Sequence, residues 1–257
     1  MVVFYTLPPA DISYPYILIN LNRPAPGLRY IRKHKDSIKS VIIDSGVEIF
    51  RDPQVYDYPR GHEHKLLSIY KKVRRLVKDT WAVIPDYPDD YRPAGLWAGG
   101  LTNIDRTVRN VEYYTQNYAD VNFIIPVQGF NNSPSSILTS LSKYKKLGIL
   151  KKYDYFAVAN LCVSKRVKNI IKTLYLARWA LPGRYIHAFG INTFAARKAR
   201  YIINSFDSLA WTFPRSSGRP SCKNKASRIR YFAEYIMRYA GFLDLPEGYL
   251  TYLKTFI

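Results

Sequence analysis

The sequence predicts an α/β protein with a (β/α)8 barrel of the TIM type, formed as a single domain over residues 1–257. Two observations lead to this fold class. Short apolar runs rich in β-branched and aromatic residues recur along the chain, and segments with helical periodicity separate the later runs. This alternation is typical of a parallel sheet covered by helices. A doubly wound open sheet is the alternative, since a strand count taken from sequence can differ by about one or two.

Eight apolar runs have the length and composition of β-strands. They cover residues 2–6, 16–20, 40–44, 81–85, 122–127, 155–160, 184–190 and 206–211. A proline-containing link without a helical pattern joins the first two, so we expect abbreviated N-terminal βα units.

Five segments have the apolar periodicity of amphipathic helices, and most begin near a residue that can cap a helix. The segments cover residues 64–79, 102–118, 133–148, 164–180 and 193–203. The cap candidates are Thr102, Ser133, Ser164 and Thr193. In the first segment the predicted buried face consists of Leu66, Leu67, Tyr70, Val73, Leu76 and Val77. The tail from Lys225 predicts a helix that ends near Gly241, followed by a short terminal helix on the outside.

The charge balance favours a polyanionic partner. With 39 Lys and Arg against 19 Asp and Glu, the chain has a formal net charge of +20. Neutralising phosphates releases counterions and gives affinity that does not depend on nucleic acid sequence. A basic surface without a partner and an anionic membrane surface are the alternatives.

Cysteine usage and hydropathy exclude other classes of protein. Cys162 and Cys222 are too few for a disulfide-rich scaffold or a four-cysteine zinc site, and His62 and His64 lack further ligands. We therefore expect no metal. No signal-peptide pattern is present, and no apolar run reaches the roughly 18 residues that cross a bilayer. The expectation is a cytoplasmic protein with no membrane partner.

Polar residues recur at or just after the ends of the predicted strands. They are Asp44, Asp86, Gln128, Asn160, His187, Gly190 and Asp207. In a parallel barrel these strand ends converge on one face, where active sites form. Each residue also has a structural interpretation: Asp44 or Asp86 can form a turn, and Asn160 can cap a helix. Their common position favours a functional site.

The residue types indicate chemistry at a sugar that carries a base. Two carboxylates on different strands, Asp44 and Asp207, can divide the roles of nucleophile and general acid/base at an anomeric carbon. Asp86 and Gln128 together offer acceptors and a donor to the edge of a planar heterocycle.

A set of motifs in conserved order resembles the tRNA-guanine transglycosylase superfamily, including its DNA-acting relatives that insert 7-deazaguanines. The motifs are IDSG at 43–46, PDYPDDY at 85–91, VQG at 127–129, VANLCVS at 158–164, RYIHAFG at 184–190 and FDSLAWTFPRSSGR at 206–219. They span about two-thirds of the chain.

The resemblance implies a role for each site residue. Asp207 would be the nucleophile at C1′ of the target nucleotide, and Asp44 would carry the proton of the departing and incoming bases. The base-binding set would be Asp86, Gln128, Asn160, Leu161, His187 and Gly190, with His187 stacked against or bordering the base. The nucleic-acid backbone would contact Arg215, Arg219, Lys223 and Lys225.

The resemblance also implies a substrate. Guanine in DNA, or second in tRNA, would be exchanged for guanine or a 7-deazaguanine. The family's cysteine-rich zinc site is absent, so we expect no cofactor. Two turns depart from the family, which has Gly-Gly where this chain has Gly46-Val47 and Ala159-Asn160. The sequence leaves open a homodimer, a catalytically inactive nucleic-acid-binding barrel, and a glycosidase or nucleosidase for small substrates.

Overall fold

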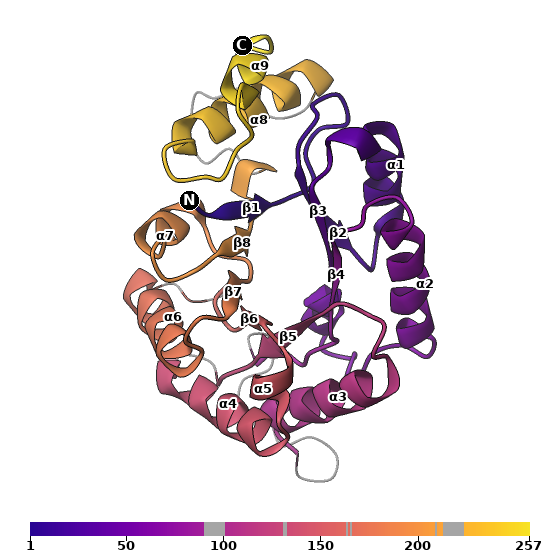
Figure 1. Cartoon of the computed structure of the whole chain (residues 1–257), viewed down its shortest axis with the longest axis vertical. Coiled ribbons are helices and arrows are strands. Elements are labelled where there is room, and N and C mark those ends of the chain that lie inside the picture. The colour runs from indigo at the N-terminus through magenta and orange to yellow at the C-terminus, as the bar shows by residue number, and fades with distance from the viewer. Residues whose placement is uncertain (90–100, 131–132, 163, 165, 209, 213–223) are drawn as a thin grey trace.

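Eight parallel strands form a nearly closed barrel with helices around it, as the computed structural model of the protein shows (Figure 1). The structure describes residues 1–89, 101–130, 133–162, 164, 166–208, 210–212 and 224–257. The strands are β1 (Val3–Tyr5), β2 (Tyr16–Asn20), β3 (Ser40–Asp44), β4 (Thr80–Val83), β5 (Phe123–Val127), β6 (Tyr155–Val158), β7 (Tyr185–Ala188) and β8 (Ser205–Asp207). They follow one another around the sheet without a reversal of order. The single-domain (β/α)8 barrel is confirmed, and the doubly wound alternative is wrong.

The seam between β1 and β2 is closed by one residue. The Thr6 N–H donates to the carbonyl oxygen of Tyr16 at 3.3 Å, and the Leu18 N–H donates to the carbonyl oxygen of Thr6 at 3.0 Å. Pairing stops there because Pro8 and Pro9 follow and cannot donate a ladder hydrogen bond. These two backbone hydrogen bonds join β1 to β2, so the barrel is nearly closed at this seam.

The helices lie outside the strands. They are α1 (Pro24–His34), α2 (His62–Arg74), α3 (Asn103–Asn117), α4 (Ile137–Lys146), α5 (Ile149–Lys152), α6 (Val167–Ala180), α7 (Thr193–Lys198), α8 (Lys225–Tyr239) and α9 (Tyr249–Lys254). None of the helices in these ranges is long and apolar enough to cross a bilayer.

The expectation of abbreviated N-terminal units holds for the first unit and is wrong for the second. No helix separates β1 from β2, but α1 follows β2. Its prolines lie in the first turn, where the missing N–H costs nothing. Gly27 is required for close packing, because a Cβ there would lie 2.9 Å from Cγ1 of Ile19.

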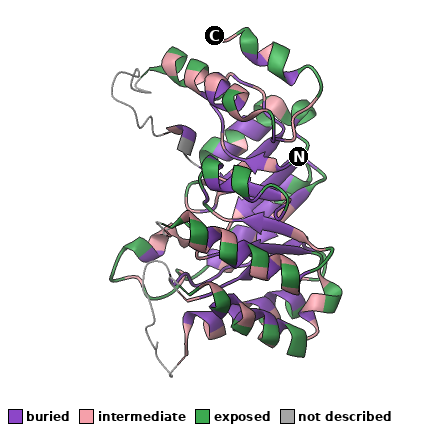
Figure 2. Ribbon diagram, turned by 90° about the vertical axis from the view of Figure 1, so that its left-hand side faces the viewer, coloured by how far each residue is buried: buried purple, intermediate pink, exposed green. Residues whose placement is uncertain are grey.

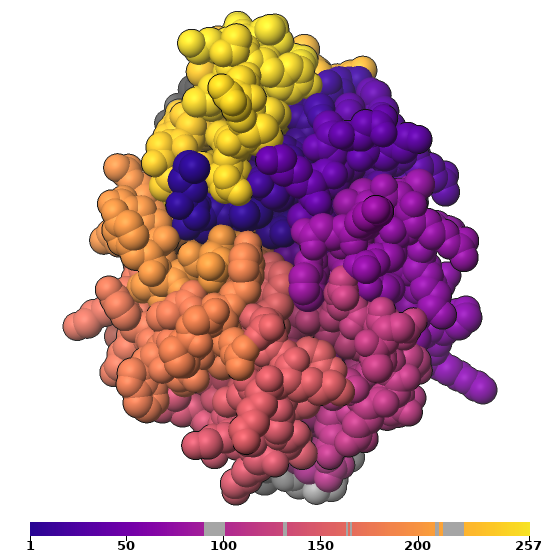
Figure 3. Space-filling model, in the orientation of Figure 1, coloured from indigo at the N-terminus to yellow at the C-terminus, as the bar shows by residue number. Residues whose placement is uncertain are grey.

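The C-terminal helices occupy the place of the missing first helix. The ring of Phe232 in α8 packs edge-on against Tyr14 in the β1–β2 link, with ring centroids 5.6 Å apart. The Tyr249 hydroxyl of α9 donates to the carbonyl oxygen of Ser13 at 2.7 Å. Figure 3 shows these helices (yellow) against the N-terminal residues (indigo), where the Val2 N–H donates to the carbonyl oxygen of Phe242 at 2.9 Å.

Buried residues make up most of the strands and the helix faces toward them (Figure 2), and most of these residues are apolar. Val41, Ile42 and Ile43 of β3 are fully buried, which explains why the strands have continuous apolar runs. Tyr5 reaches across the interior, and its hydroxyl donates to Oγ of Ser40 at 2.8 Å. The core therefore supports the strand ends as a rigid frame.

Several element boundaries differ from the sequence prediction, as the last strand and the helix caps illustrate. The last strand ends at Asp207 instead of residue 211, and Ala210–Thr212 forms a 3-10 turn. Of the predicted caps, Thr102 accepts the Asp105 N–H in a capping box, whereas Asn192, not Thr193, caps α7. Ser164 lies before Arg166, which is at the N-cap of α6.

Candidate active site

The polar residues singled out in the sequence lie at one rim of the barrel. Asp44 and Asp207 are the last residues of β3 and β8, and Gln128 directly follows β5. Asp86 and Asn160 lie two to three residues beyond β4 and β6. The carboxyl ends of parallel strands meet at this face of a (β/α)8 barrel, where loops and strand ends build functional sites.

Asp207 is held by one of its two carboxylate oxygens. Its Oδ1 accepts the Gly190 N–H at 2.9 Å and lies 3.1 Å from Nε2 of His187. Its Oδ2 accepts no hydrogen bond from the part of the chain that the structure describes, and 15% of the side chain is exposed. The carboxylate is therefore oriented through Oδ1, and Oδ2 has no hydrogen-bond donor among the described residues.

Gly190 supports Asp207 through its backbone. It has φ = 60°, the left-handed region in which glycine has no steric penalty. A Cβ there would lie 2.7 Å from Cβ of Cys162. In the structure, the Gly190 N–H contacts the candidate nucleophile Asp207. The sequence analysis expected Gly190 in the base-binding set and did not predict this contact.

His187 lies beneath Asp207 and is fully buried. A carboxylate oxygen can only accept, so Nε2 donates to Asp207, and Nδ1 forms a second hydrogen bond with the Ser205 hydroxyl, at 2.9 Å. Oγ of Ser205 lies 3.1 Å from the Tyr155 hydroxyl, which extends the chain of polar contacts into the barrel. The ring is fully buried and contacts the Asp207 carboxylate, and the expected stacking role of His187 stays a prediction.

Asp44 is surrounded by acidic groups. Burial, and then the negative charges of Glu48, Asp207 and Asp86, raise the pKa of Asp44 well above its usual range, against one stabilising backbone contact from Gly46. The negative charge of Asp207 therefore acts on the carboxyl of Asp44, which is consistent with their position on the same rim of the barrel. A carboxyl with a raised pKa keeps its proton to a higher pH than usual, a property that suits a general acid.

Two asparagines, at the end of β2 and two residues beyond it, and an acid after β3 complete this side of the rim, and the sequence prediction missed them. Asn20 and Asn22 both donate side-chain hydrogen bonds to the Glu48 carboxylate, the latter at 3.1 Å. Asn22 also donates to the carbonyl oxygen of Gly46 at 2.8 Å. Asn20 pairs in register with Asp44, so its position as the last residue of a predicted strand was the available signal.

Asp86 and Gln128 form a buried hydrogen-bonded chain. Oδ1 of Asp86 accepts from the Ser45 hydroxyl at 3.0 Å, and Oδ2 accepts from Nε2 of Gln128 at 2.5 Å. This contact fixes the amide, so Oε1 of Gln128 is its acceptor end. That oxygen is buried and has no hydrogen-bond partner among the described residues. A buried acceptor of this kind calls for a donor from a ligand or water.

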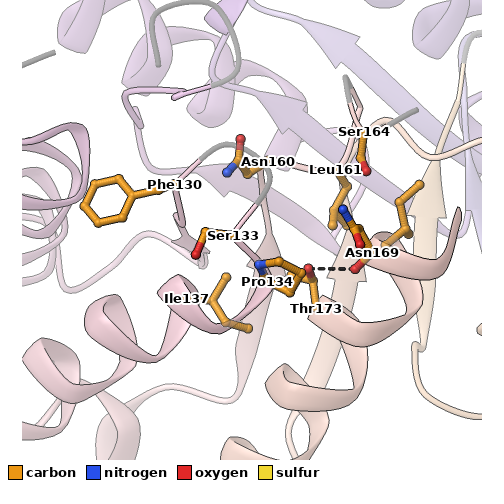
Figure 4. A pocket seen from close by; sticks show the side chains of 10 residues that line it. Phe130, Ser133, Pro134, Ile137, Asn160, Leu161, Ser164, Asn169 and Thr173 are labelled. Atoms are coloured by element: carbon orange, nitrogen blue, oxygen red, sulfur yellow. Dashed lines mark hydrogen bonds between the residues drawn. The ribbon is translucent and has the colours of Figure 1, made fainter. Parts of the chain in front are cut away.

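Asn160 and Leu161 lie beside a small pocket between the strand-end loops and the helices α4 and α6 (Figure 4). Asn160 has φ = 64°, a conformation that asparagine tolerates better than most residues. Its Nδ2 donates to the carbonyl oxygen of Gly129 at 3.0 Å. The side chain therefore ties the β6 loop to the β5 loop, and its role as a helix cap is excluded by the start of α6 at Val167.

The predicted contacts to the nucleic-acid backbone fall mostly outside the described residues, since Arg215, Arg219 and Lys223 all lie there. Lys225 is the first residue of α8 and is exposed, with its Nζ 3.0 Å from Oδ2 of Asp11.

The described residues contain no group of three or more His, Cys, Asp or Glu side chains placed to hold a metal ion. His62 is buried against the ring of Tyr58, with centroids 4.2 Å apart, whereas His64 is exposed. Residues two apart on a helix do not face each other, so the two imidazoles cannot act as a pair.

The fold and the strand-end carboxylates together define an α/β barrel with an acidic candidate site at its C-terminal face. Comparison with known proteins adds no family to this class: no family model matches the chain, and no curated protein matches it.

Proposed function

We propose that the protein is a base-exchange transglycosylase that replaces guanine in a nucleic acid by guanine or a 7-deazaguanine. The observation that carries the proposal is the contrast between the two rim carboxylates. Asp207 is held by Gly190 and His187 with Oδ2 unoccupied by the described residues, and Asp44 has a raised pKa beside it. Carboxyl groups in such different environments suit a nucleophile and a general acid.

The proposed reaction consists of two displacements at one sugar carbon. Oδ2 of Asp207 attacks C1′, the bond from C1′ to N9 of guanine breaks, and the departing base takes the proton of Asp44. The incoming base then returns a proton to Asp44 as its N9 attacks C1′ and releases Asp207. Atoms and charge balance over the cycle, and the configuration at C1′ is retained.

Base recognition is assigned to the chain from Ser45 through Asp86 to Gln128. The unpaired Oε1 of Gln128 would accept an N–H from the base, and Asp86 holds the amide in the orientation that this requires. A site that hydrogen-bonds a substrate donor rejects analogues without it, because its buried acceptor would then stay unpaired.

A nucleic acid is the proposed carrier of the target base because of the net charge of +20. DNA is preferred over tRNA, as the sequence analysis expects. An enzyme of this type must take its target base out of a helix or act on a single strand.

The test is incubation of the purified protein with DNA or tRNA and radiolabelled guanine or a 7-deazaguanine. We expect label in one nucleic acid and a covalent protein adduct on a denaturing gel. Asp207→Asn should abolish both, whereas Asp44→Asn should keep the adduct and slow base exchange. Asp36→Asn is the matched control, since Asp36 is an exposed acid away from the rim.

Base exchange by Asp207→Asn would refute the assignment of the nucleophile. Equal binding of nucleic acid by the wild type and Asp207→Asn, with no label incorporated by either, would support the inactive binding protein instead. Cleavage of free nucleosides without incorporation into polymer would support a small-substrate nucleosidase.

A further inference from the structure

A groove of about 540 Å³ lies between the β1–β2 link, α1 and the start of α8. Its first lining residue, Leu7, follows Thr6. The Thr6 hydroxyl donates to the carbonyl oxygen of Ser208 at 3.3 Å, and Ser208 follows Asp207. This α1–α8 groove therefore begins within a few residues of the candidate nucleophile, although it belongs to a different part of the surface.

The α1–α8 groove is strongly basic. Its lining includes four cationic side chains, Arg29, Lys33, Lys225 and Arg228, and one carboxylate, Asp11. The excess of three positive charges is concentrated in one concave surface. Low-dielectric walls strengthen the field in such a concavity and attract anions.

The four cations are not equivalent. Lys33 and Lys225 both form ion pairs with Asp11, at 3.2 and 3.0 Å. These ammonium groups lower the pKa of Asp11, with the Lys225 hydrogen bond as the largest cause, so Asp11 stays ionised. The guanidinium groups of Arg29 and Arg228 form no hydrogen bond or ion pair with any residue that the structure describes. Two exposed donors of fixed geometry thus face the groove without an internal partner.

The apolar part of the lining suits the same kind of ligand. Pro8, Pro9 and Pro26 form walls between the charged groups. Proline rings offer apolar contact without a donor N–H, which fits the sugar units that alternate with phosphates along a strand. Arginine is the side chain best matched to phosphate oxygens.

We propose that the α1–α8 groove binds the phosphodiester backbone of the nucleic acid strand next to the nucleotide held at Asp207. This inference rests on the proposed function, and it adds the path that the strand takes away from the site. Asp11 acts in it as an internal substitute for phosphate: it neutralises two lysines until a strand binds and releases them.

The test is binding of a fluorescent single-stranded DNA of mixed sequence, and of RNA of the same sequence, over a range of salt concentrations. All variants carry Asp207→Asn, so that no chemistry contributes. We expect Arg29→Gln with Arg228→Gln to weaken binding on the order of tenfold and to reduce the salt slope by about 1.4, the value for two lost contacts to a single strand. Asp11→Asn should tighten binding several-fold, because it removes the competing charge.

The matched control is Lys151→Gln with Lys152→Gln. These exposed lysines precede β6 and therefore lie at the opposite end of the barrel, and the substitution removes the same charge. It should change binding less than twofold. The opposite signs expected for the Arg and Asp11 variants exclude unfolding as the cause, since misfolding would weaken binding in both.

The outcomes separate this inference from the proposed function. If the control weakens binding as much as the Arg variant does, or if the protein binds neither oligonucleotide, the groove assignment is wrong. Binding to vesicles with anionic lipid that depends on Arg29 and Arg228, with oligonucleotide binding unchanged, would also overturn it in favour of a membrane. Loss of binding in the Arg variant, together with no base exchange by the wild type, would support the groove and refute the transglycosylase.

Discussion

Gly190→Ala tests how the backbone supports the candidate nucleophile. An alanine at φ = 60° costs about 1–2 kcal/mol of unfolding free energy. Its Cβ would overlap Cβ of Cys162 at 2.7 Å, and such overpacking adds about 1–3 kcal/mol. The strain is relieved by moving residue 190, which displaces the N–H that donates to Oδ1 of Asp207. A hydrogen bond to a charged group contributes about 1.5–3 kcal/mol, so adduct formation should slow by roughly 10- to 150-fold.

Gly183→Ala is the control for the backbone strain alone. Gly183 has φ = 72°, but nothing lies within 4 Å of a Cβ placed there. We expect urea denaturation to show a loss of about 1–2 kcal/mol for Gly183→Ala and a larger loss for Gly190→Ala. Single-turnover adduct formation should fall in Gly190→Ala only. Equal adduct rates for the two folded variants would show that the Gly190 N–H does not position Asp207.

Three further predictions concern buried titratable groups. The raised pKa of Asp44 makes the folded state progressively less stable as pH rises above about 4. Asp44→Asn should therefore raise the unfolding free energy at pH 7 and have little effect at pH 4. An equal effect at both pH values in urea titrations would contradict this. His187→Phe keeps an aromatic ring but removes the hydrogen bonds to Ser205 and Asp207. It should lower stability by about 1–3 kcal/mol and slow the adduct while oligonucleotide affinity stays unchanged, and unchanged adduct kinetics would remove His187 from the site. Burial lowers the pKa of His62 to about 4, so stability should fall by up to about 3 kcal/mol as pH drops from about 6.5 to 4. His62→Phe should flatten that part of the pH profile, and a profile with the same slope would refute the assignment.

The barrel could be predicted from the sequence because its strands are buried on both faces. Runs such as residues 41–43 and 123–127 are continuously apolar for that reason, and their alternation with helices leaves few other folds. The helix α1 was missed because Pro24, Pro26 and Gly27 argue against a helix by propensity. Close contact with Ile19 overrides that propensity, and a contact between segments is not visible in local sequence.

Helix boundaries set a second limit. Leu76 was placed on the buried face of the helix that begins near residue 62, but 39% of it is exposed. The helix ends at Arg74, so its periodicity does not continue to Leu76. Ile69 is buried instead and was not included in the predicted face.

For the candidate site, position along the strands was predictable and contact partners were not. The strand-end rule brought Asp44, Asp86, Gln128 and Asp207 to one rim. It could not show that His187 faces Asp207 from below, because a strand residue's depth within the barrel depends on strand tilt and register. The Glu48 contacts with Asn20 and Asn22 were missed because they join the end of β2 to residues after β3, and local sequence does not show such a contact.

The dependence of β1 on distant partners has a consequence for how the protein is made. β1 is synthesised first, yet Thr6 and Ser208, which meet beside it, are 202 residues apart. Phe242, whose carbonyl oxygen accepts the N–H of Val2 just before β1, is translated later still. On the ribosome, Phe4 and Tyr14 are therefore without the residues that they contact in the folded protein until most of the chain has been translated. The pairing of β1 with β8 that closes the ring cannot form before residues 205–208 are made, so the rim that holds Asp207 cannot be complete earlier.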